Sequence, residues 1–237
     1  MKGIGILLLR CGSKGYGFKN IQLLNGRPLA YYTIDFMLSD ESVTSVIVSS
    51  DCEEVLNCIE KYNSERIILH RRSDLNSKDV SQTEDALVEV VEYYEKEFSN
   101  NYEFVLYAQA TEPLRPIGLL AKAINEYRSG SFDTVFAAFA YHKNFWIVDD
   151  NGPKRITNNG ESSLPRQIKQ PIFREDTGIC LISSPDVIRS GKRIGETVKI
   201  IPYEHIGALL DIHSRKDFLL AEYLIKVSSK LEDENIG

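Results

Sequence analysis

Short apolar runs and amphipathic stretches alternate along this chain of 237 residues. Apolar or β-branched runs bounded by turn residues are typical of buried strands, and apolar positions at helical spacing are typical of helices that cover a sheet. The predicted strands are residues 4–9, 43–48, 66–69, 104–107, 134–140, 178–183 and 198–201. The predicted helices are residues 28–38, 52–62, 82–98, 116–127 and 214–227. This alternation predicts an α/β fold with a doubly wound, mostly parallel sheet and helices on both faces.

Polar residues mark where three of these helices should start. Asp51 is predicted to cap the helix that follows the second strand. Ser81 with Glu84, and Ser214 with Asp217, have the spacing of capping boxes.

The alternation fails between about residues 141 and 171. Polar turn residues dominate there, as in the segment 149–153, Asp-Asp-Asn-Gly-Pro. We therefore expect one domain, residues 1–237, with residues 141–171 forming an excursion from the main sheet.

Composition narrows the class of protein. The chain is acidic, with a net charge of -6, and has no basic stripe, so nucleic acid is not an expected partner. No apolar stretch reaches the length of a membrane span, and the start lacks a signal-peptide layout, so we expect a cytoplasmic protein with no membrane partner. The 4 cysteines show no C-x-x-C pair and no zinc spacing, which favours scattered reduced thiols.

The first strand leads into a cationic loop that is rich in glycine. No Asp or Glu precedes Asp35, whereas Arg10, Lys14 and Lys19 all lie in or beside this loop. Glycines let backbone N–H groups approach phosphate oxygens, and cations neutralise their charge, so the loop indicates a small polyanion such as a nucleoside triphosphate. It is not a Walker A loop, because Phe18 occupies the position of the lysine. A plain turn with solvated lysines is the alternative.

Residues 10–20 resemble the N-terminal signature of the CMP-N-acylneuraminate (sialic or nonulosonic acid) cytidylyltransferase family, Ala-Arg-Gly-Gly-Ser-Lys-Gly-x-Pro-x-Lys-Asn. The chain departs from it at Leu9, Cys11 and 17–18. The resemblance implies a Rossmann-like fold of the nucleotide-diphospho-sugar transferase type. It also implies transfer of CMP from CTP to an acidic sugar with release of pyrophosphate, dependence on a divalent metal, and a homodimer in which the excursion packs on the second subunit.

The same resemblance assigns the nucleotide-binding residues. Lys19 and Arg10 would be catalytic, and Asn20 would read the cytosine. The loop after the third strand resembles Arg-Pro-x-x-Leu, which places Arg71 near the base or ribose, although a plain surface arginine is the alternative. The full predicted set is Arg10, Gly12, Ser13, Lys14, Lys19, Asn20, Arg71 and Ser81.

Two further motifs resemble the family's acceptor-binding segments. Residues 109–115 resemble Gln-Pro-Thr-Ser-Pro-Leu-Arg, which has Gln109 face the sugar, with Glu112 in place of serine. Arg166-Gln167 resembles the family's Arg-Gln, and an arginine suits the carboxylate of an acidic acceptor. Asp176 stands in place of the family's asparagine.

The metal motif departs most from the family. Residues 211–218 resemble Asp-Ile-Asp-Thr-x-x-Asp-Phe, in which Asp211 keeps the first ligand and His213 replaces the second. Three outcomes are open: His213 binds a softer ion such as Mn²⁺, Asp211 suffices for Mg²⁺, or activity is weakened. Asp217 is predicted to be a helix cap. The alternatives to a sialic-acid-type enzyme are a cytidylyltransferase for another acidic acceptor (3-deoxy-octulosonate or a phosphonate) and a CTP-binding homologue with weakened catalysis.

Overall fold

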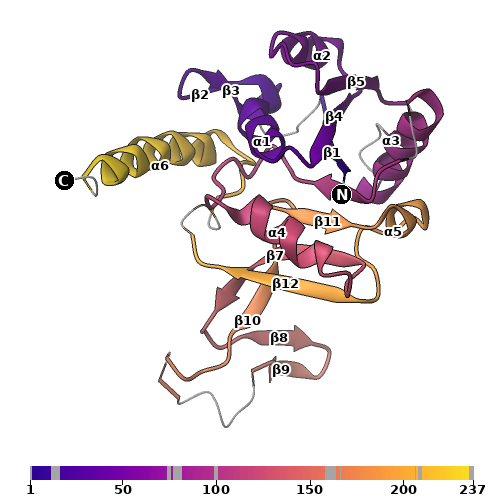
Figure 1. The fold of residues 1–237 in the computed structure, drawn as a ribbon. Coiled ribbons are helices and arrows are strands. Elements are labelled where there is room, and N and C mark those ends of the chain that lie inside the picture. Colours follow the sequence, from indigo (N-terminus) through magenta and orange to yellow (C-terminus); the bar gives the residue numbers. More distant parts are fainter. Residues whose placement is uncertain are drawn as a thin grey trace.

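The computed structural model describes residues 2–11, 17–73, 76, 82–98, 101–157, 164–165, 167–205, 207 and 210–234, the last seven without their side chains. In this part of the chain an eight-stranded sheet forms the centre, in the order β10-β7-β11-β6-β1-β4-β5 with β12 paired to β7 (Figure 1). Its strands are β1 (Gly3–Leu9), β4 (Val43–Ser50), β5 (Ile67–Arg71), β6 (Phe104–Tyr107), β7 (Thr134–Tyr141), β10 (Ile172–Glu175), β11 (Leu181–Ser183) and β12 (Val198–Tyr203).

Most pairings in the sheet are parallel. Strand β1 runs parallel to β4 and β6, β4 to β5, and β12 to β7. Strand β11 is antiparallel to both of its neighbours, and β10 is antiparallel to β7. The predicted α/β fold with a mostly parallel sheet is therefore confirmed.

Helices cover both faces of the sheet. On one face α1 (Leu29–Leu38), α2 (Glu53–Glu60) and α4 (Leu119–Arg128) contribute to one apolar cluster, and on the other α3 (Thr83–Glu97) and α5 (Pro185–Arg189) contribute to a second. Helix α6 (Arg215–Glu234) packs by Phe218 and Ala221 against a third cluster that includes Leu24 and Leu29. Leu24 belongs to a small hairpin of β2 (Leu23–Leu24) and β3 (Arg27–Pro28). None of the helices in the described ranges is both apolar enough and long enough to span a bilayer.

The predicted excursion contains a hairpin of β8 (Trp146–Asp149) and β9 (Gly152–Arg155), which the turn residues join. Gly152 has a φ of 99°, a left-handed conformation that glycine adopts at little cost. The hairpin lies apart from the central sheet (Figure 1), and Trp146, Ile147 and Val148 are exposed on it.

The capping residues predicted for α2 and α3 are wrong, although both helices are present. Asp51 is not the cap of α2, whose N-cap is Cys52, because the Asp51 carboxylate instead accepts the backbone N–H of Cys11 at 2.9 Å. The capping box of α3 is formed by Gln82 and Asp85. Short strands β8, β9 and β10 and helix α5 carry too little periodicity to be predicted.

Candidate functional site

The ends of β1 and β4 lie side by side at one edge of the sheet. Their parallel register pairs Leu9 with Ser50, so the loops that follow both strands leave the sheet together. Arg72, which is 4% exposed, reaches under this edge and donates to the carbonyl oxygens of Leu9 at 3.2 Å and Ser49 at 2.7 Å. Burial lowers the pKa of this guanidinium. A buried cation thus holds the two strand ends together by their carbonyl groups.

The second half of the cationic loop is described from Gly17 onward. Asn20 is buried, and its amide donates to the carbonyl of Arg10 at 3.1 Å, which closes the loop on itself. Phe18 has a φ of 53°, a left-handed conformation that is strained for a residue other than glycine.

Lys19 joins this loop to the far end of the chain. Its Nζ donates to the carbonyl of Ile212 at 2.8 Å, across 193 positions in the sequence. Burial lowers the pKa of Lys19, while the nearby carboxylates of Asp211 and Asp217 act in the opposite direction. The hydrogen bond therefore brings the predicted phosphate-binding loop and the predicted metal motif into one site.

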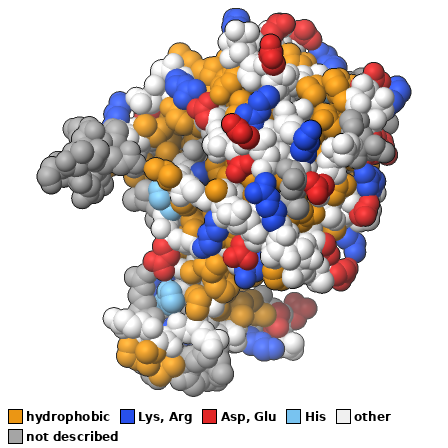
Figure 2. Space-filling model, in the orientation of Figure 1, with side chains coloured by type: hydrophobic (Ala, Val, Ile, Leu, Met, Phe, Trp, Pro, Cys, Tyr) orange, Lys and Arg blue, Asp and Glu red, His pale blue; other side chains and the backbone are white. Residues whose placement is uncertain are grey.

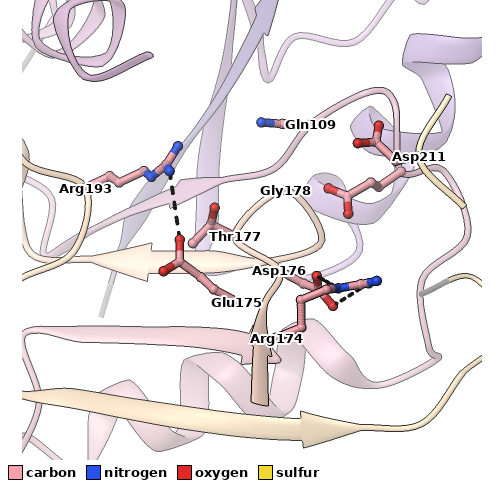
Figure 3. Close-up of a pocket in the computed structure, with 9 residues that line it drawn as sticks. Gln109, Arg174, Glu175, Asp176, Thr177, Gly178, Arg193 and Asp211 are labelled. Atoms are coloured by element: carbon pink, nitrogen blue, oxygen red, sulfur yellow. Dashed lines mark hydrogen bonds and ion pairs between the residues drawn. The ribbon is translucent and has the colours of Figure 1, made fainter. Parts of the chain in front are cut away.

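A cavity of about 400 Å³ opens beside the metal motif (Figure 3). The connection between β6 and α4 supplies Gln109 and Glu112, and the turn after β10 supplies Asp176 to Gly178. The remaining lining residues are Arg174, Glu175, Arg193 and Asp211. Charged groups dominate this lining, which suits a polar ligand.

Both arginines of the cavity are paired with carboxylates of the same cavity. Arg174 donates to Asp176 from Nε at 2.7 Å and from Nη2 at 3.0 Å. The hydroxyl of Tyr203 donates to the same carboxylate at 2.6 Å, and burial raises the pKa of that phenol. Arg193 lies 3.8 Å from Glu175 (Figure 3) and 3.3 Å from Glu84, which is not among the lining residues. The other two carboxylates that line the cavity, Glu112 and Asp211, are not partners of these arginines in the pairs just described.

Glu112 is the most perturbed acid in the cavity. Burial raises its pKa to about 7, and the carboxylates of Asp211 and Asp176 act in the same direction while Arg115 opposes them. A Cβ placed on Gly178 would overlap Oε2 of Glu112, so a larger residue there would displace the carboxyl group. The site therefore contains a carboxyl group that can change its protonation near neutral pH.

Arg115 connects the segments that form the cavity wall by hydrogen bonds to their backbone. It donates to the carbonyl oxygens of Gln109 at 2.7 Å, Gly178 at 3.1 Å and Ile179 at 2.8 Å. The backbone N–H of Gln109 also donates to the carbonyl of Gly178 at 2.8 Å. Arg115, the last residue of the motif at 109–115, thus ties the two main wall segments to each other.

The metal motif is anchored at both ends. The N–H of Ile212 donates to the carbonyl of Thr111 at 2.9 Å, and Nε2 of His213 lies 2.7 Å from Oδ2 of Asp211. Asp217 accepts the N–H of Ser214 at 2.7 Å, while its own N–H donates to the Ser214 hydroxyl at 3.4 Å. The predicted capping role of Asp217 is confirmed.

The structure brings together most of the predicted residues that it describes. Arg10, Lys19 and Asn20 form the loop side, while Gln109, Asp176 and Asp211 line the cavity. Arg71 instead forms an exposed ion pair with Glu53 at 2.8 Å, and Gln167 is exposed and is not among the residues that line the cavity. The predicted residues Gly12, Ser13, Lys14, Ser81 and Arg166 lie outside the described part of the chain.

Sequence reasoning missed Arg72, Arg174, Glu175 and Arg193 as members of this site. A signal for Arg72 exists in the alternation of a strand, because His70 and Arg72 are buried while Arg71 between them is exposed. No local pattern marks Arg193, which reaches the cavity from a loop.

Solved structures with this fold include CMP:2-keto-3-deoxy-manno-octonic acid synthetase complexed with CTP, at a TM-score of 0.67 and 13% identity over 96% of this chain and 100% of that chain. They also include 4-diphosphocytidyl-2C-methyl-D-erythritol synthase from Anaerococcus prevotii, at a TM-score of 0.67 and 17% identity over 95% and 99% of the two chains. Such low identities establish the α/β fold alone. A model of the cytidylyltransferase family matches residues 4–233, so the chain belongs to that family.

The curated relatives match most of this chain, but they differ in length. The N-acylneuraminate cytidylyltransferase of Streptococcus agalactiae serotype V is 28% identical over 226 residues, which is 92% of this chain but 52% of the relative. This chain thus spans about half the length of that protein. The CMP-N,N'-diacetyllegionaminic acid synthase of Legionella pneumophila is 21% identical over 97% of this chain and 99% of its own length. The post-translational flagellin modification protein B of Campylobacter coli is 23% identical over 92% of each.

Proposed function

We propose that this protein transfers CMP from CTP to a nonulosonic acid, a sialic-acid-like sugar, and releases pyrophosphate. The observation that carries the proposal is the hydrogen bond from Lys19 to Ile212, because it sets the cationic loop beside the acidic cavity. A hydroxyl of the sugar would attack the α-phosphorus of CTP, so catalysis depends on positioning and on neutralising phosphate charge.

The loop side is the proposed site of the triphosphate. Arg10 and Lys19 would neutralise the leaving pyrophosphate, assisted by the loop residues Gly12, Ser13 and Lys14. Asn20, which closes the loop onto the Arg10 carbonyl, is the proposed contact for the cytosine. Ser81 is a further proposed contact of the nucleotide, whereas the exposed ion pair of Arg71 with Glu53 does not support a role of Arg71 in the site.

The metal motif fits a divalent cation. Asp211 lines the cavity together with Glu112, and carboxylate oxygens are the ligands that Mg²⁺ prefers. The imidazole of His213 lies within 2.7 Å of Asp211, so the same place also suits Mn²⁺. Asp211 would hold the ion, with His213 as the second ligand. The ion would supply positive charge to the phosphates.

The cavity is the proposed acceptor site. Gln109 can both donate to and accept from sugar hydroxyl groups, and Asp176 is held in place by Arg174 and Tyr203. Since both cavity arginines are already paired, an acidic acceptor needs further positive charge, which Arg166 and the divalent ion would supply. Gln167 would lie at the edge of this site. The names of the relatives from S. agalactiae and L. pneumophila favour a nonulosonic acid as the acceptor.

The acceptor can be identified by measuring pyrophosphate release from CTP. N-acetylneuraminate, diacetyllegionaminate, 3-deoxy-octulosonate and a phosphonate should each be tested with Mg²⁺ and with Mn²⁺. Turnover of a nonulosonic acid is the expected result. Preferential turnover of 3-deoxy-octulosonate or the phosphonate would support the alternative acceptor class. If CTP raises the melting temperature but no acceptor turns over with either metal, the chain is a CTP-binding homologue without catalysis and the proposal is wrong.

We also propose that the protein is a homodimer. The hairpin exposes Trp146 and Val148, and α6 exposes Leu219, Leu220 and Tyr223. Hydrophobic side chains are visible on the lower projection of the molecule in Figure 2, where Figure 1 shows the hairpin. Clusters of exposed apolar residues are typical of contacts between subunits.

Light scattering with size-exclusion chromatography tests this arrangement. We expect a mass of twice 26.9 kDa for the parent protein and a shift toward the monomer for Trp146→Ser. Ile117→Ser is the matched control, because Ile117 is 93% exposed on a different surface. A monomeric parent protein at micromolar concentration would contradict the proposal.

A further inference from the structure

Two cysteines and a glutamate meet beside the cationic loop. One ligand atom from each of Cys11, Cys52 and Glu54 lies within 4.8 Å of the other two. The thiol of Cys52 donates to Oε2 of Glu54 at 3.2 Å. Neither the fold nor the proposed transfer of CMP accounts for this cluster.

The register of the sheet creates the cluster. Strands β1 and β4 are parallel and pair Leu9 with Ser50, so the residues two positions further on, Cys11 and Cys52, also become neighbours. The backbone N–H of Cys11 is fixed by Asp51 at 2.9 Å. The sequence shows no zinc spacing because the two thiols come from strands 41 positions apart, counted from Cys11 to Cys52.

The environment of the cluster suits a cation that is bound by anionic ligands. Cys52 is the N-cap of α2 and Glu54 lies in its first turn, where the partial positive charge of the helix favours anionic groups. Burial raises the pKa of the Cys52 thiol to about 12, so this thiol keeps its proton until a cation displaces it. Cys52 is 2% exposed, Cys11 is half-buried and Glu54 is exposed. A metal ion could therefore enter from the Glu54 side and reach both sulfur atoms.

We propose that Cys11, Cys52 and Glu54 form a binding site for a soft divalent cation, with Zn²⁺ as the expected ion and Cd²⁺ as its probe. Two sulfur ligands and one carboxylate, with water in the fourth position, form a tetrahedral set that such ions accept. Binding deprotonates both thiols and releases two protons to the buffer, with no oxidation or reduction. This site is separate from the oxygen and imidazole ligands of Asp211 and His213.

A titration of the reduced, metal-free protein with Cd²⁺ tests the proposal. The reductant should be a phosphine that leaves the thiols free, and the readouts are the near-ultraviolet thiolate-to-cadmium absorption and calorimetry in two buffers of different ionisation enthalpy. We expect an absorption band that saturates at one ion per chain and the release of about two protons per ion. The melting temperature should rise by roughly 5 °C when free Zn²⁺ is about a hundredfold above its Kd.

Variants assign the ligands. Cys11→Ser and Cys52→Ser should each remove the band, and Glu54→Gln should keep it while weakening Cd²⁺ binding by about tenfold. Cys58→Ser and Glu53→Gln are matched controls that should leave the titration unchanged. Since Cys52 is buried and its variant could unfold, Cys11→Ser and Glu54→Gln decide the question by themselves. The proposal is overturned if no band forms, or if the band persists in Cys11→Ser or is lost in Cys58→Ser.

Discussion

The two sides of the site differ in the charged groups that they bury and in the partners of those groups. On the loop side a buried cation, Arg72, is surrounded by backbone carbonyl groups of Leu9 and Ser49. On the cavity side Arg115 likewise donates to backbone carbonyl groups, but carboxyl groups lie there as well: Asp176 is paired with Arg174, whereas Glu112 has a pKa of about 7. Carbonyl groups do not titrate, so the contacts that Arg72 makes with them should persist over a wide pH range. The cavity side should respond to pH.

The proposed function accounts for this difference by the ligand of each side. A triphosphate requires positive charge, and neutral carbonyl partners leave the charge of a buried arginine in place. An acceptor sugar offers hydroxyl groups, for which carboxylates and amides are suitable partners. Four predictions test this division, from the largest expected effect to the smallest.

Arg72→Ala should lower the free energy of unfolding by about 3 to 4 kcal/mol, because it removes a charged donor that joins two strand ends. The neighbouring variant Arg71→Ala is the control and should change stability by less than about 1 kcal/mol, since Arg71 forms only an exposed ion pair. Urea denaturation of both proteins measures the difference. Equal losses in the two variants would show that Arg72 is not the support of the loop side.

Lys19→Ala should reduce kcat by about 10²- to 10³-fold, as expected for the loss of one charge that stabilises the transition state. Its thermal stability should change much less. Lys122→Ala, at an exposed position on α4, is the control. Steady-state assays of pyrophosphate release measure the effect, and an unchanged kcat in Lys19→Ala would exclude the proposed role of Lys19.

Glu112→Gln should change the pH dependence of stability. With a folded-state pKa of about 7, raised above the ordinary 4.5, Glu112 keeps its proton in the folded protein while the unfolded chain loses it. Its contribution to stability is therefore greatest below pH 4.5 and falls as the pH rises to about 7, by about 3 kcal/mol in total.

The amide that replaces the carboxyl group in Glu112→Gln cannot ionise, so this decline should disappear in the variant. Urea midpoints at pH 5 and pH 8 measure it, with Glu175→Gln as the control at a carboxylate that is 47% exposed. If parent and Glu112→Gln lose the same stability between the two pH values, Glu112 does not titrate in this range.

His213→Asp should raise the ratio of activity with Mg²⁺ to activity with Mn²⁺ by on the order of tenfold, because it replaces an imidazole by a carboxylate. His213→Ala is the matched variant and should weaken activity with Mn²⁺ without improving activity with Mg²⁺. Rates measured over a concentration series of each metal give the ratio. A ratio that is the same in all three proteins would place the metal away from His213.

Local periodicity was enough to predict the alternation of strands and helices and hence the α/β class, since it records which side of each element is buried. The short motifs identified Lys19, Gln109 and Asp211 as candidates because their residue types suit phosphate, sugar and metal. Periodicity carries no information on strand direction, and the antiparallel pairing of β11 between β6 and β7 was not predicted.

What the sequence alone determined, therefore, is the order of the elements, the family and the chemical types gathered at the strand ends. The tertiary structure decided that Arg72 joins the ends of β1 and β4, that Glu112 shares a cavity with Asp211, and that Cys11 lies against Cys52. The physical reason is distance along the chain. Burial and contact between residues that are 41 or 193 positions apart depend on the order and register of the strands, which no short segment encodes.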